Sequence, residues 1–216
     1  LGDVYKRQVL QCLQGRKDLG LHTEMFTDGV MHMIQSGHVT GEKKTLHHRK
    51  VASSIIMGSK ALYDFIDHNE MIEMYPVNHM NDPYVIGQND RMVSINSCLE
   101  IDLYGQVASE AIGLEQFSGT GGQVDYLRGA KRSRGGRSIL AFTSTAKGGT
   151  VSRIVPVLPP GATVTSGRNE VDYIATEYGA VRLRGLTLRE RALALVSIAH
   201  PDFRPGLMAA IEERFS

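Results

Sequence analysis

The sequence lacks the long apolar run that a membrane span requires. None of its apolar stretches approaches the roughly 20 residues needed to cross a bilayer, and nothing at its start resembles a signal peptide. It also lacks a charge excess, because 24 basic and 23 acidic residues leave a net charge of +1. Neither nucleic acid nor an anionic membrane is therefore expected as a partner.

Cysteine is scarce as well. The 216 residues contain two, Cys12 and Cys98, which are too few for a disulfide framework. This scarcity is typical of a reducing compartment, so we expect a cytoplasmic protein. Both lie in apolar surroundings, which predicts that both are inert. The eight histidines show no metal-ligand spacing, so no metal is expected, and His47 and His48 are expected at the surface.

The chain has no initiator methionine, and its first eight residues, LGDVYKRQ, fit neither a strand nor a helix start. The DVYKRQ part resembles the translated end of a transposase sequencing adapter. We expect residues 1–8 to be such an artefact that is not part of the fold, with a native polar leader as the alternative. On the first interpretation the native protein continues upstream, and residues 9–216 form its C-terminal part.

Short apolar runs alternate with helical patterns from Val9 onwards. Strands alternating with helices predict an α/β fold with an open, mostly parallel sheet flanked by helices. No linker is visible, so a single domain is expected. Ser59 is the expected N-cap of one helix, and Thr187 with Glu190 forms a capping box for another. Extended runs are expected near residues 18–23, 50–58, 91–105, 137–145, 152–158, 162–166 and 171–177, and helices over 28–37, 59–69, 123–132, 187–200 and 204–215.

The strongest local feature is the stretch SGTGGQVDY, residues 118–126. Gly119, Gly121 and Gly122 permit positive φ and let backbone N–H groups approach a ligand closely. A helical pattern follows directly, so these groups are expected at a helix N-terminus, where an anion or oxyanion is stabilised. The spacing is not that of a dinucleotide-binding fingerprint. A structural turn explains the pattern equally well.

Other candidate groups are weaker. The stretch TSTAKGGT, residues 143–150, lacks the order of a P-loop, although Lys147 remains a candidate phosphate contact beside its ordinary interpretation as a solvated turn lysine. No Gly-x-Ser-x-Gly elbow is present. Glu24 follows a strand-like run, and Glu100 and Asp102 share one face of an extended segment. Each carboxylate is either a reacting group or a structural one, and the residues alone leave both readings open.

Five long stretches carry a family signature when they are taken together: DLGLHTEMFTDGV, NDPYVIGQNDRMVSINSCLEIDLYGQVASEAIG, FSGTGGQVDYLRGA, STAKGGTVSRIVPVLPPGA and VDYIATEYGAVRLRGLTLRERALALVSIAHPDFR. They resemble the C-terminal half of the acetyl-CoA hydrolase/transferase family, within the class I CoA-transferases. The resemblance extends from Leu13 to the end and is strongest to 4-hydroxybutyrate and butyryl-CoA:acetate CoA-transferases. It implies a CoA-transferase fold of the NagB/RpiA-like class.

The resemblance also implies roles for individual residues. Glu24, in HTEM, falls on the family's nucleophile. The family's Gly-x-Gly-x-x-Pro CoA loop, which lies upstream of the nucleophile, is absent from this sequence. The implied CoA-binding residues are Leu99, Gly119, Gly121, Gly122, Gln123 and, more weakly, Lys147.

The implied reaction transfers CoA between an acyl-CoA and a short-chain carboxylate such as acetate, butyrate or 4-hydroxybutyrate. It follows a ping-pong course through a glutamyl-CoA thioester. A glutamate side chain is an anion at neutral pH, so it needs no separate base. CoA is a substrate, no permanently bound cofactor is implied, and homo-oligomers are usual in the family. An acyl-CoA hydrolase of the same fold and a non-catalytic acyl-CoA-binding module stay open as alternatives.

Overall fold

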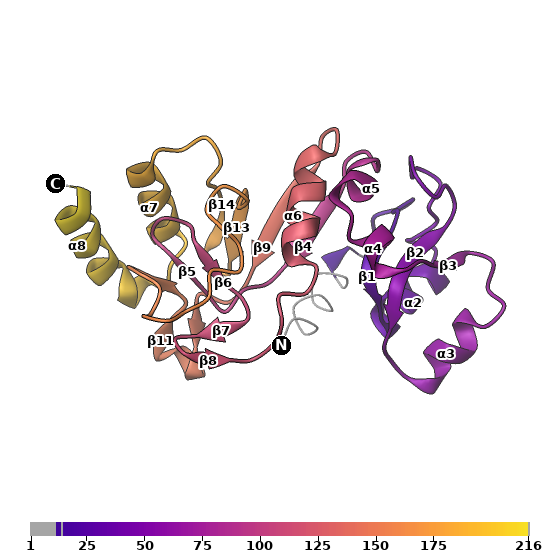
Figure 1. Ribbon diagram of the computed structural model, residues 1–216, viewed down its shortest axis with the longest axis horizontal. Coiled ribbons are helices and arrows are strands. Elements are labelled where there is room, and N and C mark those ends of the chain that lie inside the picture. Colours follow the sequence, from indigo (N-terminus) through magenta and orange to yellow (C-terminus); the bar gives the residue numbers. More distant parts are fainter. Residues whose placement is uncertain (1–11, 14, 216) are drawn as a thin grey trace. The chain divides into compact units, whose positions relative to one another are not determined.

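The computed structural model describes residues 12, 13 and 15–215, whose contacts divide into two compact units (Figure 1). Of these residues, those up to Met92 and Arg128–Gly136 form the first unit, and Val93–Leu127 with residues 137–215 form the second. The chain therefore passes between the units at residues 92/93, 127/128 and 136/137. This division differs from the single domain that the lack of a linker suggested, because three short crossings leave no linker in the sequence. The predicted adapter segment, residues 1–8, lies outside the described residues.

The first unit is built on a three-stranded parallel sheet in the order β1-β2-β3. Parallel neighbours require a crossover connection, and here α2 and α3 supply one each. Figure 1 shows the short helix α4 beside β1 and β2, which it contacts. The elements of this unit are β1 His22–Phe26, α2 Asp28–Gln35, β2 Val51–Ile56, α3 Lys60–Ile66, β3 Ile72–Met74, α4 Val77–Met80 and α5 Pro83–Gly87.

Local sequence explains two of these helices. The side chain of Ser59 accepts a hydrogen bond from the N–H of Leu62, which confirms Ser59 as the N-cap of α3. Asp82 caps α5 in the same way, with Pro83 at the first helical position. By contrast, α4 has a single turn and no side-chain cap. Its position therefore depends on tertiary contacts.

The second unit contains a four-stranded sheet, β14-β13-β9-β4, a three-stranded sheet, β12-β5-β6, and the antiparallel pairs β7-β8 and β10-β11. Its core includes Ile101, Leu140, Ile174 and Leu195, each at most 1% exposed. Helices α7 and α8 pack against each other, and the chain enters α6 in this unit. The elements are β4 Val93–Asn96, β5 Glu100–Asp102, β6 Val107–Ala108, β7 Ala111–Ile112, β8 Glu115–Gln116, α6 Gln123–Arg132, β9 Arg137–Ala141, β10 Thr145–Ala146, η1 Lys147–Gly149, β11 Val151–Ser152, β12 Ile154–Val155, β13 Tyr173–Thr176, β14 Gly179–Arg182, α7 Leu188–Ser197, η2 Pro201–Phe203 and α8 Arg204–Phe215.

The prediction of an α/β fold is confirmed, although the strands form several small sheets rather than one. Among the described residues five strand pairs are parallel and four antiparallel. The predicted extended run 91–105 is divided between β4 and β5, which belong to different sheets. The predicted strand at 162–166 is reduced to an isolated bridge at Ser166.

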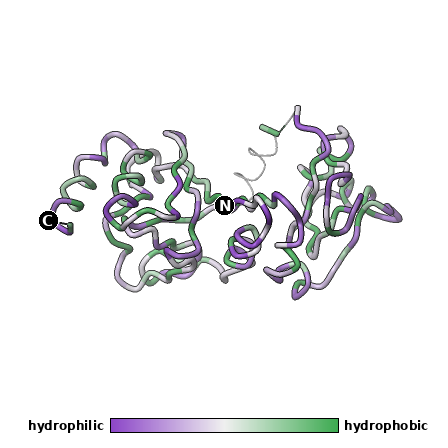
Figure 2. Tube along the Cα trace, turned by 90° about the horizontal axis from the view of Figure 1, so that it is seen from above, coloured by the Kyte–Doolittle hydropathy of each residue, from purple (hydrophilic) through white to green (hydrophobic). Residues whose placement is uncertain are grey.

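Apolar and polar residues alternate along the trace of both units (Figure 2). No helix in the described part of the chain is long and apolar enough to cross a membrane. The capping box of Thr187 and Glu190 is present at the start of α7, with both reciprocal hydrogen bonds. That helix ends at Ser197, before the predicted end at residue 200 and ahead of Pro201, which cannot continue an α-helix.

Candidate active site

Glu24 is half-buried in the middle of β1, two residues before the strand ends. Its Oε2 atom accepts a hydrogen bond of 3.2 Å from Nδ2 of Asn81. Its backbone carbonyl accepts hydrogen bonds of 3.1 Å from the hydroxyls of Ser53 and Ser54 on β2. The strand is thus fixed through its backbone. Within residues 15–215, the carboxylate has one amide donor and no cation paired with it.

His22 ties the same strand to α4. It is 6% exposed, and its Nε2 atom lies 2.9 Å from the carbonyl oxygen of Met80, the last residue of α4. Burial lowers the pKa of His22 to about 4, so the ring is neutral at pH 7. Asn81 follows Met80 directly. His22 thus donates to the last residue of α4, and Asn81, the C-cap of that helix, donates to the Glu24 carboxylate.

The glycine loop lies directly before α6 in the second unit, as predicted. Gly119 and Gly121 are exposed, and a Cβ added at either would meet no atom within 4 Å. Gly121 has φ +55°, a conformation that favours glycine. Gly122 is buried. The outer part of the loop therefore presents bare backbone to solvent at the start of a helix.

The chain entering this loop is anchored by Glu110, which is 4% exposed. Its backbone carbonyl accepts a hydrogen bond of 2.7 Å from the N–H of Phe117. Its carboxylate accepts hydrogen bonds from Gln116 and from the hydroxyl of Thr165, both at 3.1 Å. A buried carboxylate with two donors is well satisfied, so Glu110 has a structural role.

The chain leaving the loop is anchored by Gln123. Its Nε2 atom donates to the hydroxyls of Ser109 at 2.9 Å and Ser166 at 3.0 Å. The sequence suggested Gln123 as a CoA contact. Its side-chain amide nitrogen is engaged inside the fold, so that nitrogen is not available to a ligand.

Leu99 lies beside this anchor. Its N–H donates to the carbonyl oxygen of Ala108 at 2.9 Å, and Ala108 precedes the Ser109 that Gln123 holds. The carbonyl oxygen of Leu99 accepts a hydrogen bond of 2.8 Å from Nε of Arg153. The segment of Leu99 and the glycine loop, which are separate in the sequence, are therefore joined through the end of β6.

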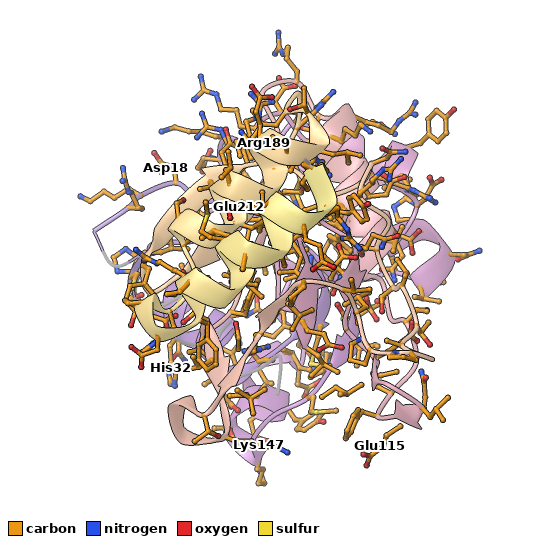
Figure 3. The ribbon with its side chains drawn as sticks, turned by 90° about the vertical axis from the view of Figure 1, so that its left-hand side faces the viewer. Asp18, His32, Glu115, Lys147, Arg189 and Glu212 are labelled. Carbon is orange, nitrogen blue, oxygen red and sulfur yellow. The ribbon has the colours of Figure 1, made fainter. Side chains whose placement is uncertain are left out.

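Arg153 extends this connection to the segment that carries Lys147. Its guanidinium also donates to the carbonyl of Cys98 and, at 3.1 Å, to the hydroxyl of Thr143. Lys147 itself is exposed, with φ +49°, and lies at the periphery of the ribbon (Figure 3). The sequence does not predict this role of Arg153, because nothing in the pattern SRIV distinguishes it from a surface arginine.

The remaining sequence candidates have other surroundings. Asp102 accepts hydrogen bonds from the N–H groups of a turn, including that of Tyr104, and is structural. Glu100 is buried, which raises its pKa, and its Oε1 atom has no hydrogen-bond donor among the described residues. Burial raises the pKa of the Cys98 thiol to about 12, so it is inert as predicted. Cys12 is exposed, which contradicts the expectation of an apolar setting.

A cavity of about 320 Å³ in the second unit contains none of the predicted site residues. Arg168, Arg184 and Arg191 contribute to its wall. The buried guanidinium of Arg191 donates to the carbonyls of Leu183, Tyr104 and Arg168, which assigns it to holding the fold. Across the described residues, no group of three or more His, Cys, Asp or Glu side chains is arranged to hold a metal ion.

Comparison with known protein families matches residues 58–211 to the acetyl-CoA hydrolase/transferase C-terminal domain. The chain belongs to the acetyl-CoA hydrolase/transferase family. Among curated relatives, the 4-hydroxybutyrate coenzyme A transferase of Clostridium kluyveri is 55% identical over 207 residues. These cover 96% of this chain and 48% of that protein. This confirms the resemblance found in the sequence.

A second relative is the butyryl-CoA:acetate CoA-transferase of Anaerostipes caccae, 41% identical over 91% of this chain and 45% of that protein. Among solved structures, the 4-hydroxybutyrate CoA-transferase of Porphyromonas gingivalis has a TM-score of 0.86 and 61% sequence identity. That match covers 97% of this chain and 49% of the solved chain. The chain thus spans about half the length of the relatives that it matches.

Proposed function

We propose that the protein containing this chain transfers CoA between an acyl-CoA and a short-chain carboxylate, with Glu24 as the nucleophile. The proposal rests on the half-buried Glu24 carboxylate. The Asn81 amide donates one hydrogen bond to it, and no cation in residues 15–215 pairs with it. An anionic carboxylate held by one side chain keeps lone pairs for attack. The relatives named as CoA-transferases support the same conclusion.

In the first half of the proposed reaction, an oxygen of Glu24 attacks the thioester carbonyl of the acyl-CoA. The carbon–sulfur bond breaks, and a mixed acyl-glutamyl anhydride and CoA thiolate result. The thiolate then attacks the glutamyl carbonyl of the anhydride. The donor leaves as its free carboxylate, and Glu24 carries CoA as a thioester.

The second half reverses these steps with a new acid. The acceptor carboxylate attacks the glutamyl-CoA carbonyl, which expels CoA thiolate and forms a second mixed anhydride. The thiolate attacks the acceptor's acyl carbon, which yields the new acyl-CoA and regenerates the Glu24 carboxylate. No proton is consumed in either half, so Asn81 needs only to orient the carboxylate.

The glycine loop has the second role in the proposal. Every attack on a carbonyl builds an oxyanion, and exposed backbone N–H groups at a helix start stabilise one. A single such donor typically contributes about 2.7–4 kcal/mol in a transition state. We assign this role to the backbone of the exposed Gly119 and Gly121, and CoA binding to the whole loop, including the buried Gly122 and Gln123. Leu99 and Lys147 are the further CoA contacts.

Initial-rate kinetics test the proposal on the protein expressed from its complete reading frame. With butyryl-CoA as donor and acetate as acceptor, acetyl-CoA forms, and double-reciprocal plots give the parallel lines of a ping-pong mechanism. The Glu24→Gln variant keeps the shape of the side chain but loses its charge, so it forms no acetyl-CoA. Glu213→Gln, a change of an exposed residue in α8, is the matched control and keeps the wild-type rate.

Two results separate the alternatives. Steady release of free CoA without any carboxylate acceptor shows an acyl-CoA hydrolase, in which water takes the place of the acceptor. Tight binding of butyryl-CoA without turnover, unchanged in Glu24→Gln, shows a binding module and contradicts the proposal.

A further inference from the structure

Four side chains of the first unit form a hydrogen-bonded row that the proposed chemistry does not use. The hydroxyl of Tyr75 donates to Oε2 of Glu73 at 2.7 Å and lies 3.1 Å from Nδ1 of His47. The Nε2 atom of His47 lies 3.2 Å from Nε2 of His79. The rings of His47, Tyr75 and His79 also pack together, with centroids 4.6 to 5.4 Å apart. The prediction that His47 lies at the surface is wrong, because its side chain is largely buried in this row.

The available protons determine which atom donates each hydrogen bond in the row. Tyr75 has one hydroxyl proton, which goes to Glu73, so its oxygen accepts from His47 and Nδ1 of His47 carries hydrogen. In a neutral ring, Nε2 of His47 is then the acceptor, and His79 donates to it through Nε2–H. The two Nε2 atoms face each other, and a hydrogen bond between them accounts for their distance. The described part of the chain contains no group of three or more side chains that could hold a metal ion.

The segment that presents His47 is itself held firmly. His47 has φ +53°, a left-handed conformation that costs an L-residue roughly 1–2 kcal/mol. Nearby, Nζ of Lys44 donates to the carbonyls of Leu21 at 2.7 Å and Lys50 at 2.9 Å, just ahead of β1 and β2. The side chain of His47 is 12% exposed. The fold thus maintains a strained backbone to aim this ring at His79.

His79 belongs to α4, whose single turn needs tertiary contacts to fix it. One contact is the bond from His22 to Met80, and a second is the bond from His79 to His47. Asn81, the C-cap of α4, donates to the Glu24 carboxylate. A shift of α4 therefore moves the only side-chain donor that the described residues provide to Glu24.

We propose that His47 and His79 are positioning residues for Glu24: their hydrogen bond fixes α4, and α4 places the Asn81 amide against the carboxylate. This inference deepens the proposed function and rests on it. It also makes the site sensitive to acid. His47 and His79 together can take up one added proton, because the N–H···N hydrogen bond between them stays intact. A second proton would place two cationic N–H groups 3.2 Å apart and separate the rings.

The surroundings determine how readily the pair takes up protons. Burial and the charge of Lys44 lower the pKa of His47, against a smaller opposing effect of Glu73. His47 therefore takes up a proton only as the pH falls below the ordinary histidine pKa of about 6.5. The groups that face the pair are His22 on β1, Lys44 and Lys50 in the segment before β2, and Glu73 and Tyr75 on and after β3.

The test is a pH profile on the complete protein. The rate of CoA-adduct formation on Glu24 is measured with saturating butyryl-CoA and no acceptor, between pH 5 and 8. The wild-type rate falls on the acid side as the pair takes its second proton. His47→Phe keeps ring packing but loses the bond, so the rate falls about tenfold or more at all pH values, with little change in KM.

Two further variants distinguish positioning from general damage. In His47→Gln, the glutamine gives His79 a hydrogen-bond acceptor, and this acceptor does not titrate. The rate therefore recovers to within threefold of wild type, and the fall in rate at acid pH (the acid limb) disappears. His48→Gln, a change of the neighbouring exposed histidine, keeps both the rate and the limb. A His47→Phe protein with the wild-type rate and acid limb overturns the inference.

A second readout keeps this test separate from that of the proposed function. In protein labelled with 15N-asparagine, the side-chain amide signal of Asn81 shifts as the histidine pair titrates, and the shift is absent in His47→Gln. If this shift occurs while Glu24 forms no CoA adduct, the proposed function fails and the link from the pair to Asn81 stands. If Glu24 forms the adduct but the Asn81 signal does not follow the pair, the inference fails.

Discussion

The Glu24 carboxylate differs from those of Asp102 and Glu110 in the groups that donate hydrogen bonds to it. Asp102 accepts hydrogen bonds from the two backbone N–H groups and one side chain of its own turn, and Glu110 from two side chains. Their lone pairs are engaged in structure. The Glu24 carboxylate accepts a hydrogen bond from the amide of Asn81 and from no other group in residues 15–215. At the scale of residues, the Glu24 carboxylate therefore keeps lone pairs that are available for attack.

The contribution of Asn81 is measurable by truncation. A hydrogen bond to a charged group is worth about 1.5–3 kcal/mol, so Asn81→Ala is expected to slow adduct formation on Glu24 by roughly 10- to 100-fold. Asn78→Ala, at an exposed position of α4, is the control and should leave the rate unchanged. Single-turnover rates with butyryl-CoA make the comparison. Equal rates for the two variants would show that Asn81 does not orient the carboxylate.

The buried His22 predicts how stability changes with pH. Its pKa of about 4 lies below the unfolded value of 6.5, so acid favours the unfolded chain. The stability is fully present above pH 6.5 and falls as the pH drops from there towards 4. Between pH 7 and 5 this residue accounts for a loss of about 2 kcal/mol. His47, whose pKa is also lowered, changes stability in the same direction.

Urea unfolding at pH 7 and pH 5 measures this loss. A His22→Gln protein is expected to show a smaller difference between the two pH values than wild type. His48→Gln, at an exposed position, should show the wild-type difference. An unchanged difference in His22→Gln would mean that other groups control the acid sensitivity.

At the scale of elements, the glycine loop combines fixed ends with an open middle. Glu110 and Gln123 hold the flanks, while Gly119 and Gly121 have space for a Cβ. The two glycines differ in backbone conformation, because only Gly121 of the pair lies in the left-handed region, at φ +55°. A comparison of alanine substitutions at the two positions therefore separates the effect of an added methyl group from that of backbone strain.

Alanine at these two positions is expected to act differently. Gly121→Ala places an L-residue in the left-handed region, which costs roughly 1–2 kcal/mol. It should therefore lower the free energy of unfolding and raise the KM for acyl-CoA several-fold. Gly119→Ala should leave stability unchanged. Urea unfolding and steady-state kinetics on both variants test this, and equal stability losses would contradict the backbone argument.

The sequence predicted those elements whose signals are local. Ser59 and the pair Thr187 and Glu190 cap their helices as expected, because a cap needs only neighbouring residues. The run 91–105 looked continuous, but partner strands in two different sheets divide it, and no local signal records such partners. Asn81, His47 and Arg153 were missed for the same reason. Their roles arise from contacts with residues 57, 32 and 54 positions away.

At the scale of the whole molecule, the candidate residues are divided between two units. Glu24 belongs to the first, and the glycine loop, Leu99 and Lys147 belong to the second. The chain also spans about half the length of its curated relatives. Family membership was readable from the sequence because long stretches match, whereas the roles of single residues depend on the three-dimensional setting and stay proposals.

The most direct test of the central claim is the mass of the protein after reaction. The protein from its complete reading frame is incubated with butyryl-CoA and no acceptor, and its intact mass and peptides are measured. We predict a CoA-sized adduct on the peptide that carries Glu24, lost in Glu24→Gln and retained in Glu213→Gln. An adduct that persists in Glu24→Gln, or no adduct while acetate still yields acetyl-CoA, would contradict the assignment of Glu24 as the carrier of CoA.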